Sequence, residues 1–372
     1  MEKQKRWRTG PSGACAALQL TRNRLSVSKF ELDHRLALDF PKTYGSVGYA
    51  AVGEGREAGR VSMTTTQQAL LIELEPVVEE NLNRHLAKAK PWNPHDYVPW
   101  SRGRDFALLG GQDWTPADSQ LDEVSKAAMI VNLLTEDNLP SYHREIATRF
   151  GRDGAWGQWV GQWTAEEGRH AIAIRDYLLV TRGVDPEALE RGRMLHMAAG
   201  YDSGDKSPLE ALAYVSFQEL ATRISHRNTG RASGCPIAEQ LLTRIATDEN
   251  LHMVFYRNLV EAALDIAPNA TMQAIAREVI NFQMPGSTMP GFAENALMIA
   301  KAGIYDLRSH LDDVVRPVLR FWGVFERENL DGEGARARDE LAAFLDLVEE
   351  KASYYDQRRE ERLAGAGAPS GR

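Results

Sequence analysis

The sequence predicts an all-α protein, and three observations support this prediction. From about Gln67 onward, apolar residues recur with the roughly 3.6-residue period of an α-helix. Apolar and polar residues rarely alternate in the manner of a half-buried strand. Clusters of turn-forming residues separate the periodic segments, at 151–154, 183–186, 203–208 and 233–236. The chain has 372 residues, which is enough to bury a sizeable core.

The expected helices follow from this periodicity and these turns, in chain order. The first covers residues 67–90, where apolar residues from Leu70 to Leu86 form one stripe. The turn clusters then bound the long segments in the middle of the chain, at 119–149, 155–181, 207–229 and 235–264. Further helical segments are expected after residue 265, at 268–283, 291–303, 307–320 and about 333–357.

The first 62 residues differ from the rest of the chain because they are rich in Gly, Arg and Ser and lack a sustained helical period. Residues 1–30 carry seven Lys or Arg and one acidic residue, Glu2, a balance that resembles a transit peptide. The alternative that we favour is a natural start at Met63. We therefore expect a disordered or mis-started extension over 1–62, one helical domain over 63–358 and a flexible tail over 359–372.

Composition argues against several classes of protein. The chain has 44 Lys plus Arg and 52 Asp plus Glu, a net charge of −8, which disfavours a nucleic-acid binder. It has no apolar run near the ~18 residues that a membrane span needs. Its two cysteines, Cys15 and Cys235, exclude a disulfide framework and a Cys-rich metal site, so we expect a cytoplasmic protein. The widely spaced histidines exclude zincin motifs and paired histidine boxes.

Two Glu-x-x-His pairs lie on expected long helices, Glu167 with His170 and Glu249 with His252. Side chains at i and i+3 project from one face of a helix, so each pair can reach one metal ion. The pattern alone is weak, because a third pair, Glu31 with His34, falls in the N-terminal extension. The two helical pairs therefore need support from the rest of the chain.

That support is a glutamate on the helix before each pair. Glu136 precedes the first pair and Glu219 precedes the second, at nearly equal distances along the chain. An αα-hairpin of long antiparallel helices brings such groups level, and two hairpins form a four-helix bundle with four Glu and two His facing inward. This ligand set suits a pair of iron or manganese ions, as in ferritin-like carboxylate proteins. Pro140 follows Glu136 by one helical turn, so we also expect a bend or bulge at that ligand.

Four segments around these residues resemble the soluble acyl-acyl carrier protein desaturases of the stearoyl type, in the bacterial branch used for long-chain lipids. They are Thr135–Tyr142, Trp163–His170, Val215–His226 and Asp248–His252. The likeness extends from about residue 70 to about residue 320. It implies a ferritin-like four-helix core with a diiron site, extended by additional C-terminal helices, in a homodimer. It also implies an oxidoreductase that uses O₂ and electrons from ferredoxin to insert a cis double bond into an acyl chain carried by acyl carrier protein.

Carried over to this sequence, the resemblance implies ligands for two ferrous ions at Glu136, Glu167, His170, Glu219, Glu249 and His252. Two pairings remain open for the glutamates that would bridge or chelate: Glu167 with Glu219, or Glu136 with Glu249. The motif departs from the family at Gly168, where Asn is usual. Gly in a helix costs about 1 kcal/mol relative to Ala, so this departure concerns local order and removes no ligand.

The resemblance also implies roles outside the ligand set. Thr222 matches a threonine of the oxygen pocket, although threonines often bond their own helix backbone. Trp92 would be linked through Asp248 to His170, in the way that a carboxylate orients a metal-bound imidazole. Core packing is the alternative for Trp92.

Two further sets of residues are candidates for substrate and partner contacts. Residues that could line a tunnel for the acyl chain, or simply form the core, are Met129, Leu133, Leu139, Tyr214 and Phe217. Residues that could dock an acidic carrier protein, or simply carry solvated charge, are Lys88, Lys90, Arg102 and Arg104.

Three other functions compete with the desaturase. The ligand set also suits another diiron-carboxylate enzyme, such as a hydroxylase, an N-oxygenase or a radical-generating reductase subunit. Iron storage would leave the helices after residue 265 unexplained. A non-catalytic ferritin-like binder of iron or acyl carrier would not need all six ligands. The sequence segments Trp-Thr-Ala-Glu-Glu and Ser-Phe-Gln-Glu favour the desaturase.

Overall fold

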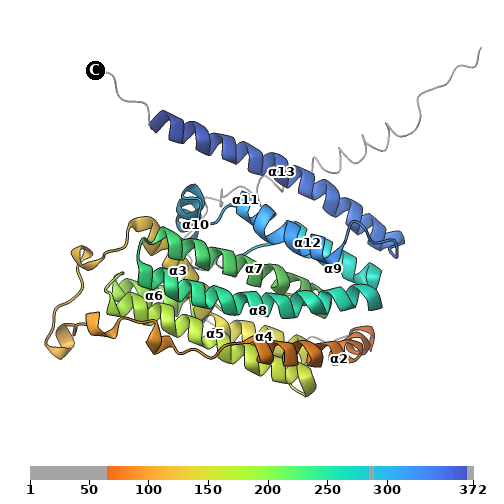
Figure 1. The fold of residues 1–372 in the computed structure, drawn as a ribbon, viewed down its shortest axis with the longest axis horizontal. Coiled ribbons are helices and arrows are strands. Elements are labelled where there is room, and N and C mark those ends of the chain that lie inside the picture. Colours follow the sequence, from red (N-terminus) through yellow and green to blue (C-terminus); the bar gives the residue numbers. More distant parts are fainter. Residues whose placement is uncertain (1–64, 285, 287–288, 367–372) are drawn as a thin grey trace, which may run out of the picture. The chain divides into compact units, whose positions relative to one another are not determined.

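A computed structural model describes residues 65–284, 286 and 289–366, and all regular secondary structure in this part of the chain is helical (Figure 1). The predicted all-α class is therefore confirmed. The expectations for residues 1–62, including the Glu31 and His34 pair, lie outside the described residues. No helix in the described part is both long and apolar enough to cross a membrane.

Four helices pack around a common axis and form the core of the fold. They are α3 (Glu123–Asp137), α5 (Gly154–Val180), α7 (Pro208–Ala232) and α8 (Pro236–Ile266). The helix α3 packs on α5 and α7, and α8 packs on the same two helices, so the four close into a bundle. This arrangement is the predicted four-helix core.

Other helices cover this bundle. The helix α2 (Thr65–Lys88) packs on α5 and α8, and α9 (Pro268–Ile280) packs on α7 and α8. The long α13 (Gly332–Ala366) lies along α9 (Figure 1). The shorter C-terminal elements are α10 (Phe292–Lys301), α11 (Leu307–Ser309), a π-helix η5 (His310–Val315) and α12 (Arg316–Trp322). The predicted C-terminal extension is present.

Local sequence explains where the bundle helices begin. Asp122 caps α3 by accepting a hydrogen bond from the backbone N–H of Ser125. Ser207 and Glu210 form a capping box at the start of α7, and Pro208 occupies its first position. Four short 3₁₀ turns between residues 94 and 118 connect α2 to α3.

The structure differs from the expected helices in three places. The segment 119–149 is two helices, α3 and α4 (Leu139–Phe150), because the chain breaks at Asn138 before Pro140. This break confirms the irregularity expected beside Glu136. The helix α6 (Pro186–Ala199) was not expected, because Asp185-Pro186 is typical of a turn as well as of a helix start; here Asp185 caps the helix and Pro186 begins it.

The third difference is the C-terminal end of α13, which runs to Ala366 rather than to about residue 357. Arg359 forms ion pairs with Asp356 on the same helix and with Asp306, and Gln357 donates a hydrogen bond to Glu361. These contacts support the last turns of the helix. The first part of the expected tail, residues 359–366, is therefore helical, and residues 367–372 lie outside the described part.

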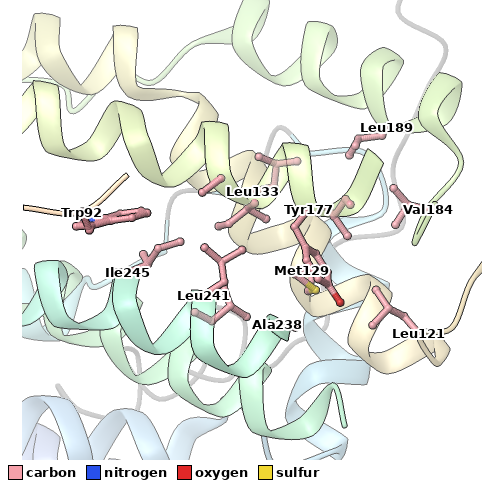
Figure 2. Packing of buried hydrophobic residues seen from close by; sticks show 14 residues of the cluster. Trp92, Leu121, Met129, Leu133, Tyr177, Val184, Leu189, Ala238, Leu241 and Ile245 are labelled. Carbon is pink, nitrogen blue, oxygen red and sulfur yellow. The ribbon is translucent and has the colours of Figure 1, made fainter. Parts of the chain in front are cut away.

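A cluster of buried hydrophobic residues packs between α3, α5 and α8 at one end of the bundle (Figure 2). Met129 and Leu133 of α3 face Leu241 and Ile245 of α8 in this cluster. Trp92, from the segment after α2, lies at one edge of it. Because this end is filled by side chains, it fixes the register of the helices that carry the predicted ligands.

Candidate metal centre

The six predicted ligands come together in the middle of the four-helix core. Glu136 comes from α3, Glu167 and His170 from α5, Glu219 from α7, and Glu249 and His252 from α8; all six are buried. The Glu-x-x-His spacing puts both members of each pair on the inward face of its helix. The helix α3 reaches its last turn at Glu136, just before the break at Asn138.

These residues form two overlapping groups of potential metal ligands. One group is Glu136, Glu167, His170 and Glu249, and the other is Glu167, Glu219, Glu249 and His252. Within each group, one ligand atom from every residue lies within 4.8 Å of the others. Glu167 and Glu249 belong to both groups, whereas Glu136 and Glu219 each belong to one. This sharing differs from both pairings that the sequence left open.

The inward atoms of both histidines face carboxylates. The Nδ1 atom of His170 lies 3.0 Å from Oε1 of Glu249, 3.4 Å from Oε2 of Glu167 and 3.6 Å from Oε2 of Glu136. The Nδ1 atom of His252 lies 2.8 Å from Oε1 of Glu167. Imidazole nitrogen and carboxylate oxygen are the ligands of iron and manganese in such sites.

Several of these atoms have no hydrogen-bond partner among the described residues. They are Oε1 of Glu167, Nδ1 of His170, Oε2 of Glu219, Oε1 of Glu249 and Nδ1 of His252. Leaving a buried polar atom unpaired is costly, and all five atoms belong to residues of the two ligand groups. The donor set and its geometry therefore fit a pair of divalent cations.

Electrostatics lead to the same conclusion. Burial, followed by the negative charge of Glu167 and of the other two glutamates, raises the pKa of Glu249 well above its usual range. Burial lowers the pKa of His170 and His252, but the surrounding carboxylates outweigh this effect and hold both pKa values well above their usual range. Four carboxylates in a dry site carry more negative charge than two imidazoles neutralise, and two divalent cations would supply the balance.

The predicted link from Trp92 to His170 is present. The indole Nε1 of Trp92 donates a 2.7 Å hydrogen bond to Oδ2 of Asp248, and the same oxygen lies 3.4 Å from Nε2 of His170. Trp92 also belongs to the buried hydrophobic cluster, so its ring packs against apolar side chains while its N–H donates to Asp248. Arg169 and Arg244 both pair with Asp248.

Two residues that were not predicted from the sequence hold the ligands Glu136 and Glu219 by hydrogen bonds. The ring nitrogen Nε2 of His226 lies 2.7 Å from Oε1 of Glu136, and Nε1 of Trp163 donates a 3.0 Å hydrogen bond to Oε1 of Glu219. Both residues fall inside the segments that carry the family resemblance, but their spacing gave no signal of this contact. His85 and Glu166 were not predicted either; they contact each other, and Glu166 also contacts His252.

The family model described as "Fatty acid desaturase" matches residues 66–366. The chain belongs to the fatty acid desaturase family. This confirms the resemblance seen in the four sequence segments.

Several relatives of this family member carry informative names. A Mycobacterium tuberculosis protein named as an acyl-[acyl-carrier-protein] desaturase, DesA1, is 54% identical over 318 residues, which cover 82% of this chain and 94% of the relative. A chloroplastic acyl-[acyl-carrier-protein] desaturase 7 of Oryza sativa is 32% identical over 339 residues, 80% of each chain. The X-ray structure of DesA2 from M. tuberculosis matches with a TM-score of 0.60 and 34% identity, over 74% of this chain and 99% of that one.

A cavity borders the metal-ligand cluster of this desaturase-family chain. Glu136, Glu167 and Glu219 contribute to its wall, and most of the remaining wall is contributed by α4, α7 and the segment between α6 and α7. Of the five residues considered for a tunnel, only Tyr214 lines this cavity. Met129, Leu133 and Phe217 are fully buried in the core, and Leu139 packs near Gly168. For Met129, Leu133 and Phe217 the structure therefore shows the core-packing alternative, and of the five residues Tyr214 alone lines this cavity.

Thr222 lines the same cavity one helical turn beyond Glu219. Its hydroxyl donates a 2.9 Å hydrogen bond to the carbonyl oxygen of Gln218, as the backbone-bonding alternative expected. The hydroxyl also accepts a 2.9 Å hydrogen bond from Nε2 of Gln218. Both hydrogen bonds fix the side chain at the cavity wall.

The cavity becomes polar away from the metal-ligand cluster. Arg149 is on α4, more than three helical turns beyond Glu136, and is buried. Its guanidinium donates to Oε2 of Glu145 at 2.8 Å, to the carbonyl oxygen of Gly204 at 2.7 Å and to that of Lys206 at 3.0 Å. Ser203 donates a further hydrogen bond to Glu145. This network ties α4 to the segment before α7, and Glu145, Arg149, Ser203 and Lys206 all contribute to the cavity wall.

The four basic residues considered for docking are all exposed. Lys88 is the last residue of α2, and Lys90 lies two residues further along the chain. Arg102 ends a 3₁₀ turn, and Arg104 forms a 2.8 Å ion pair with Asp118. Their role in docking stays a prediction.

Proposed function

We propose that this protein is an acyl-[acyl-carrier-protein] desaturase with a diiron centre. It would introduce a cis double bond into a long-chain acyl group on acyl carrier protein, using O₂ and electrons from reduced ferredoxin. The observation that carries the proposal is the pair of overlapping four-residue ligand groups inside the bundle of a fatty acid desaturase family member. The names of the relatives supply the carrier-bound substrate.

Each residue of the cluster has a proposed place. Glu136 and His170 would hold one iron ion, and Glu219 and His252 would hold the other. Glu167 and Glu249, which belong to both groups, would contact both ions. Bound iron would supply the O₂-dependent oxidation of an unactivated C–H bond, which protein side chains cannot perform.

The chain itself would position the substrate and the ligands. The cavity beside Glu136, Glu167 and Glu219 would hold the acyl segment that reacts, and its apolar walls would exclude water. His226 and Trp163 hold Glu136 and Glu219 by hydrogen bonds, so the carboxylates of these two ligands stay oriented. Thr222 would present its hydroxyl to the cavity next to Glu219.

Over the whole reaction, two hydrogens leave the acyl chain. With two electrons from ferredoxin and two protons, they reduce one O₂ molecule to two water molecules. The link from Trp92 through Asp248 to His170 is a continuous hydrogen-bonded connection toward the cluster, and we assign the entry of electrons to it.

The partners and location are part of the same proposal. Lys88, Lys90, Arg102 and Arg104 would dock the acidic carrier protein by charge complementarity. A homodimer and a cytoplasmic location complete the account, with residues 63–358 as the catalytic domain. A hydroxylase, an N-oxygenase or a non-catalytic binder is not favoured, because the relatives are named desaturases.

The test supplies iron-loaded protein with ferredoxin, its reductase, NADPH and O₂. Stearoyl carrier protein and stearoyl-coenzyme A are offered separately, and the acyl mass is read. Loss of two hydrogens from the carrier-bound chain supports the proposal. Gain of an oxygen atom would replace it with a hydroxylase.

A further inference from the structure

A buried carboxylate touches the outer nitrogen of each predicted histidine ligand. Asp248 of α8 lies 3.4 Å from Nε2 of His170 on α5. Glu166 of α5 lies 2.8 Å from Nε2 of His252 on α8. The two contacts are reciprocal: each carboxylate immediately precedes a ligand glutamate on one helix and reaches the histidine of the other helix.

Each carboxylate also contacts the aromatic ring of a residue outside the ligand set. Trp92 donates to Asp248 at 2.7 Å, and Nε2 of His85 lies 3.0 Å from Oε2 of Glu166. The ring of Trp92 lies nearly parallel to that of His170, with centroids 6.3 Å apart and planes at 14°. The rings of His85 and His252 repeat this arrangement, at 5.8 Å and 24°.

We propose that His85 and Glu166 are positioning residues that hold His252 as a metal ligand, as Trp92 and Asp248 hold His170. The inference rests on the proposed diiron centre. Nothing in the family resemblance or the ligand motif pointed to His85, which lies 81 residues before Glu166 on α2.

Hydrogen-bond chemistry fixes the direction of each contact. An ionised carboxylate only accepts hydrogen bonds, so both His85 and His252 donate to Glu166 through Nε2. The proton of His252 is thereby kept on Nε2. Nδ1 is the ring nitrogen that faces Glu167 and the ligand groups, so it is the atom that would bind a metal ion through its lone pair once its own proton has left.

The geometry shows why His85 is needed for this role. Glu166 and His85 are both buried, with 5% and 4% of their surfaces exposed. Besides the two histidines, Glu166 accepts a 2.6 Å hydrogen bond from Gln162. Removing the His85 donor leaves Glu166 with Gln162 on Oε1 and His252 on Oε2 and deletes the contact from α2 that reaches both oxygens, so the carboxylate would be held less firmly against His252.

A simple structural role for His85 makes a different prediction. If His85 only ties α2 to α5, its loss lowers stability and leaves the two metal positions equally occupied. If His85 positions His252, its loss weakens the metal position on the His252 side alone. Loss of a histidine-orienting carboxylate typically lowers metal affinity by about 10- to 100-fold, and we expect that range for the His252 position.

The experiment uses full-length protein loaded with ⁵⁷Fe²⁺ and compares His85→Leu, His85→Gln and Trp92→Phe. Iron retained against a graded chelator gives the affinity, and Mössbauer spectra separate the two iron environments. The matched control is His310→Leu, which removes a histidine that does not belong to either ligand group.

We expect His85→Leu to lose one ion at about 10- to 100-fold lower chelator concentration than the wild type, with one iron signal perturbed. Trp92→Phe should perturb the other signal. His85→Gln, whose amide nitrogen can replace the Nε2 donor, should restore most of the retention, and His310→Leu should match the wild type.

The inference is overturned if His85→Leu, folded by circular dichroism, keeps both ions as the wild type does. It is equally overturned if this variant perturbs both signals alike, or perturbs the same signal as Trp92→Phe. Wild-type protein that binds no iron pair would instead refute the proposed diiron centre, so the two failures are distinguishable.

Discussion

The polar end of the cavity leads to a prediction about acyl chain length. Arg149 and Glu145 form an ion pair whose side chains are 3% and 14% exposed. Removing Arg149 alone leaves Glu145 partly unpaired, which should cost about 3 kcal/mol, the low end for breaking a buried pair. Replacing both charges with apolar residues of similar volume should cost less, because no unpaired charge remains.

The double variant Glu145→Leu/Arg149→Met should therefore fold and extend the apolar part of the cavity. Each further buried CH₂ group contributes about 0.8 kcal/mol, or roughly a fourfold preference. An acyl chain longer by two carbons than the one preferred by the wild type should gain up to about 15-fold in relative kcat/KM.

The assay offers an equimolar mixture of carrier-bound acyl chains of different length and reads the desaturated products by mass. Arg308→Met is the matched control, because Arg308 pairs with Glu349 and Asp356 and does not line the cavity. A folded, active double variant with the wild-type chain preference would refute the assignment of this network as the end of the substrate cavity.

Three further predictions concern the ligands and the surrounding fold. Glu249→Ala or His252→Ala should abolish iron binding and activity; full activity with iron retained in either variant would contradict the ligand assignment. Trp163→Phe removes the hydrogen bond to Glu219, so kcat should fall by about 10-fold while the iron content measured by a colorimetric assay stays near wild type; an unchanged kcat would show that this contact is dispensable. Burial lowers the pKa of His310 to about 4. The unfolded chain therefore binds more protons than the folded one between about pH 4 and 6.5, so stability is fully present above this window and falls as pH drops through it. Denaturant melts of His310→Leu across that range should show a shallower fall, and a slope equal to that of the wild type would contradict the assignment.

The ligand set could be predicted from the sequence because helix geometry alone places it. The i, i+3 spacing puts Glu167 beside His170 and Glu249 beside His252, and the matching hairpin lengths bring Glu136 and Glu219 level. Which glutamates are shared could not be predicted in this way. The sharing depends on how the side chains of α5 and α8 cross the bundle axis, a relation between helices that one-dimensional spacing does not contain.

The carboxylates that contact the histidine ligands could have been predicted from the sequence. Both ligand glutamates are immediately preceded by an acidic residue, Glu166 and Asp248. A residue one position earlier is rotated by about 100° around the helix, so it faces a neighbouring helix instead of the bundle axis. The reciprocal contact with the other helix's histidine follows from that rotation once the bundle is assumed.

For Met129 and Leu133 the sequence could not decide between a tunnel lining and plain core, and the reason is physical. Apolar periodicity shows which face of a helix is buried but not whether that face meets another side chain or a void. Met129 and Leu133 face the filled end of the bundle, in contact with α8 (Figure 2). The cavity instead opens beside α4, where Pro140 and the break at Asn138 displace the chain.

The most direct test of the diiron centre is a crystal structure of the iron-loaded protein with anomalous scattering measured at the iron edge. We predict two iron peaks per chain. One lies between Glu136 and His170, the other lies between Glu219 and His252, and Glu167 and Glu249 contact both. A single peak, or an ion held by His85, Glu166 and His252, the third group of potential ligands in the described residues, would contradict the account.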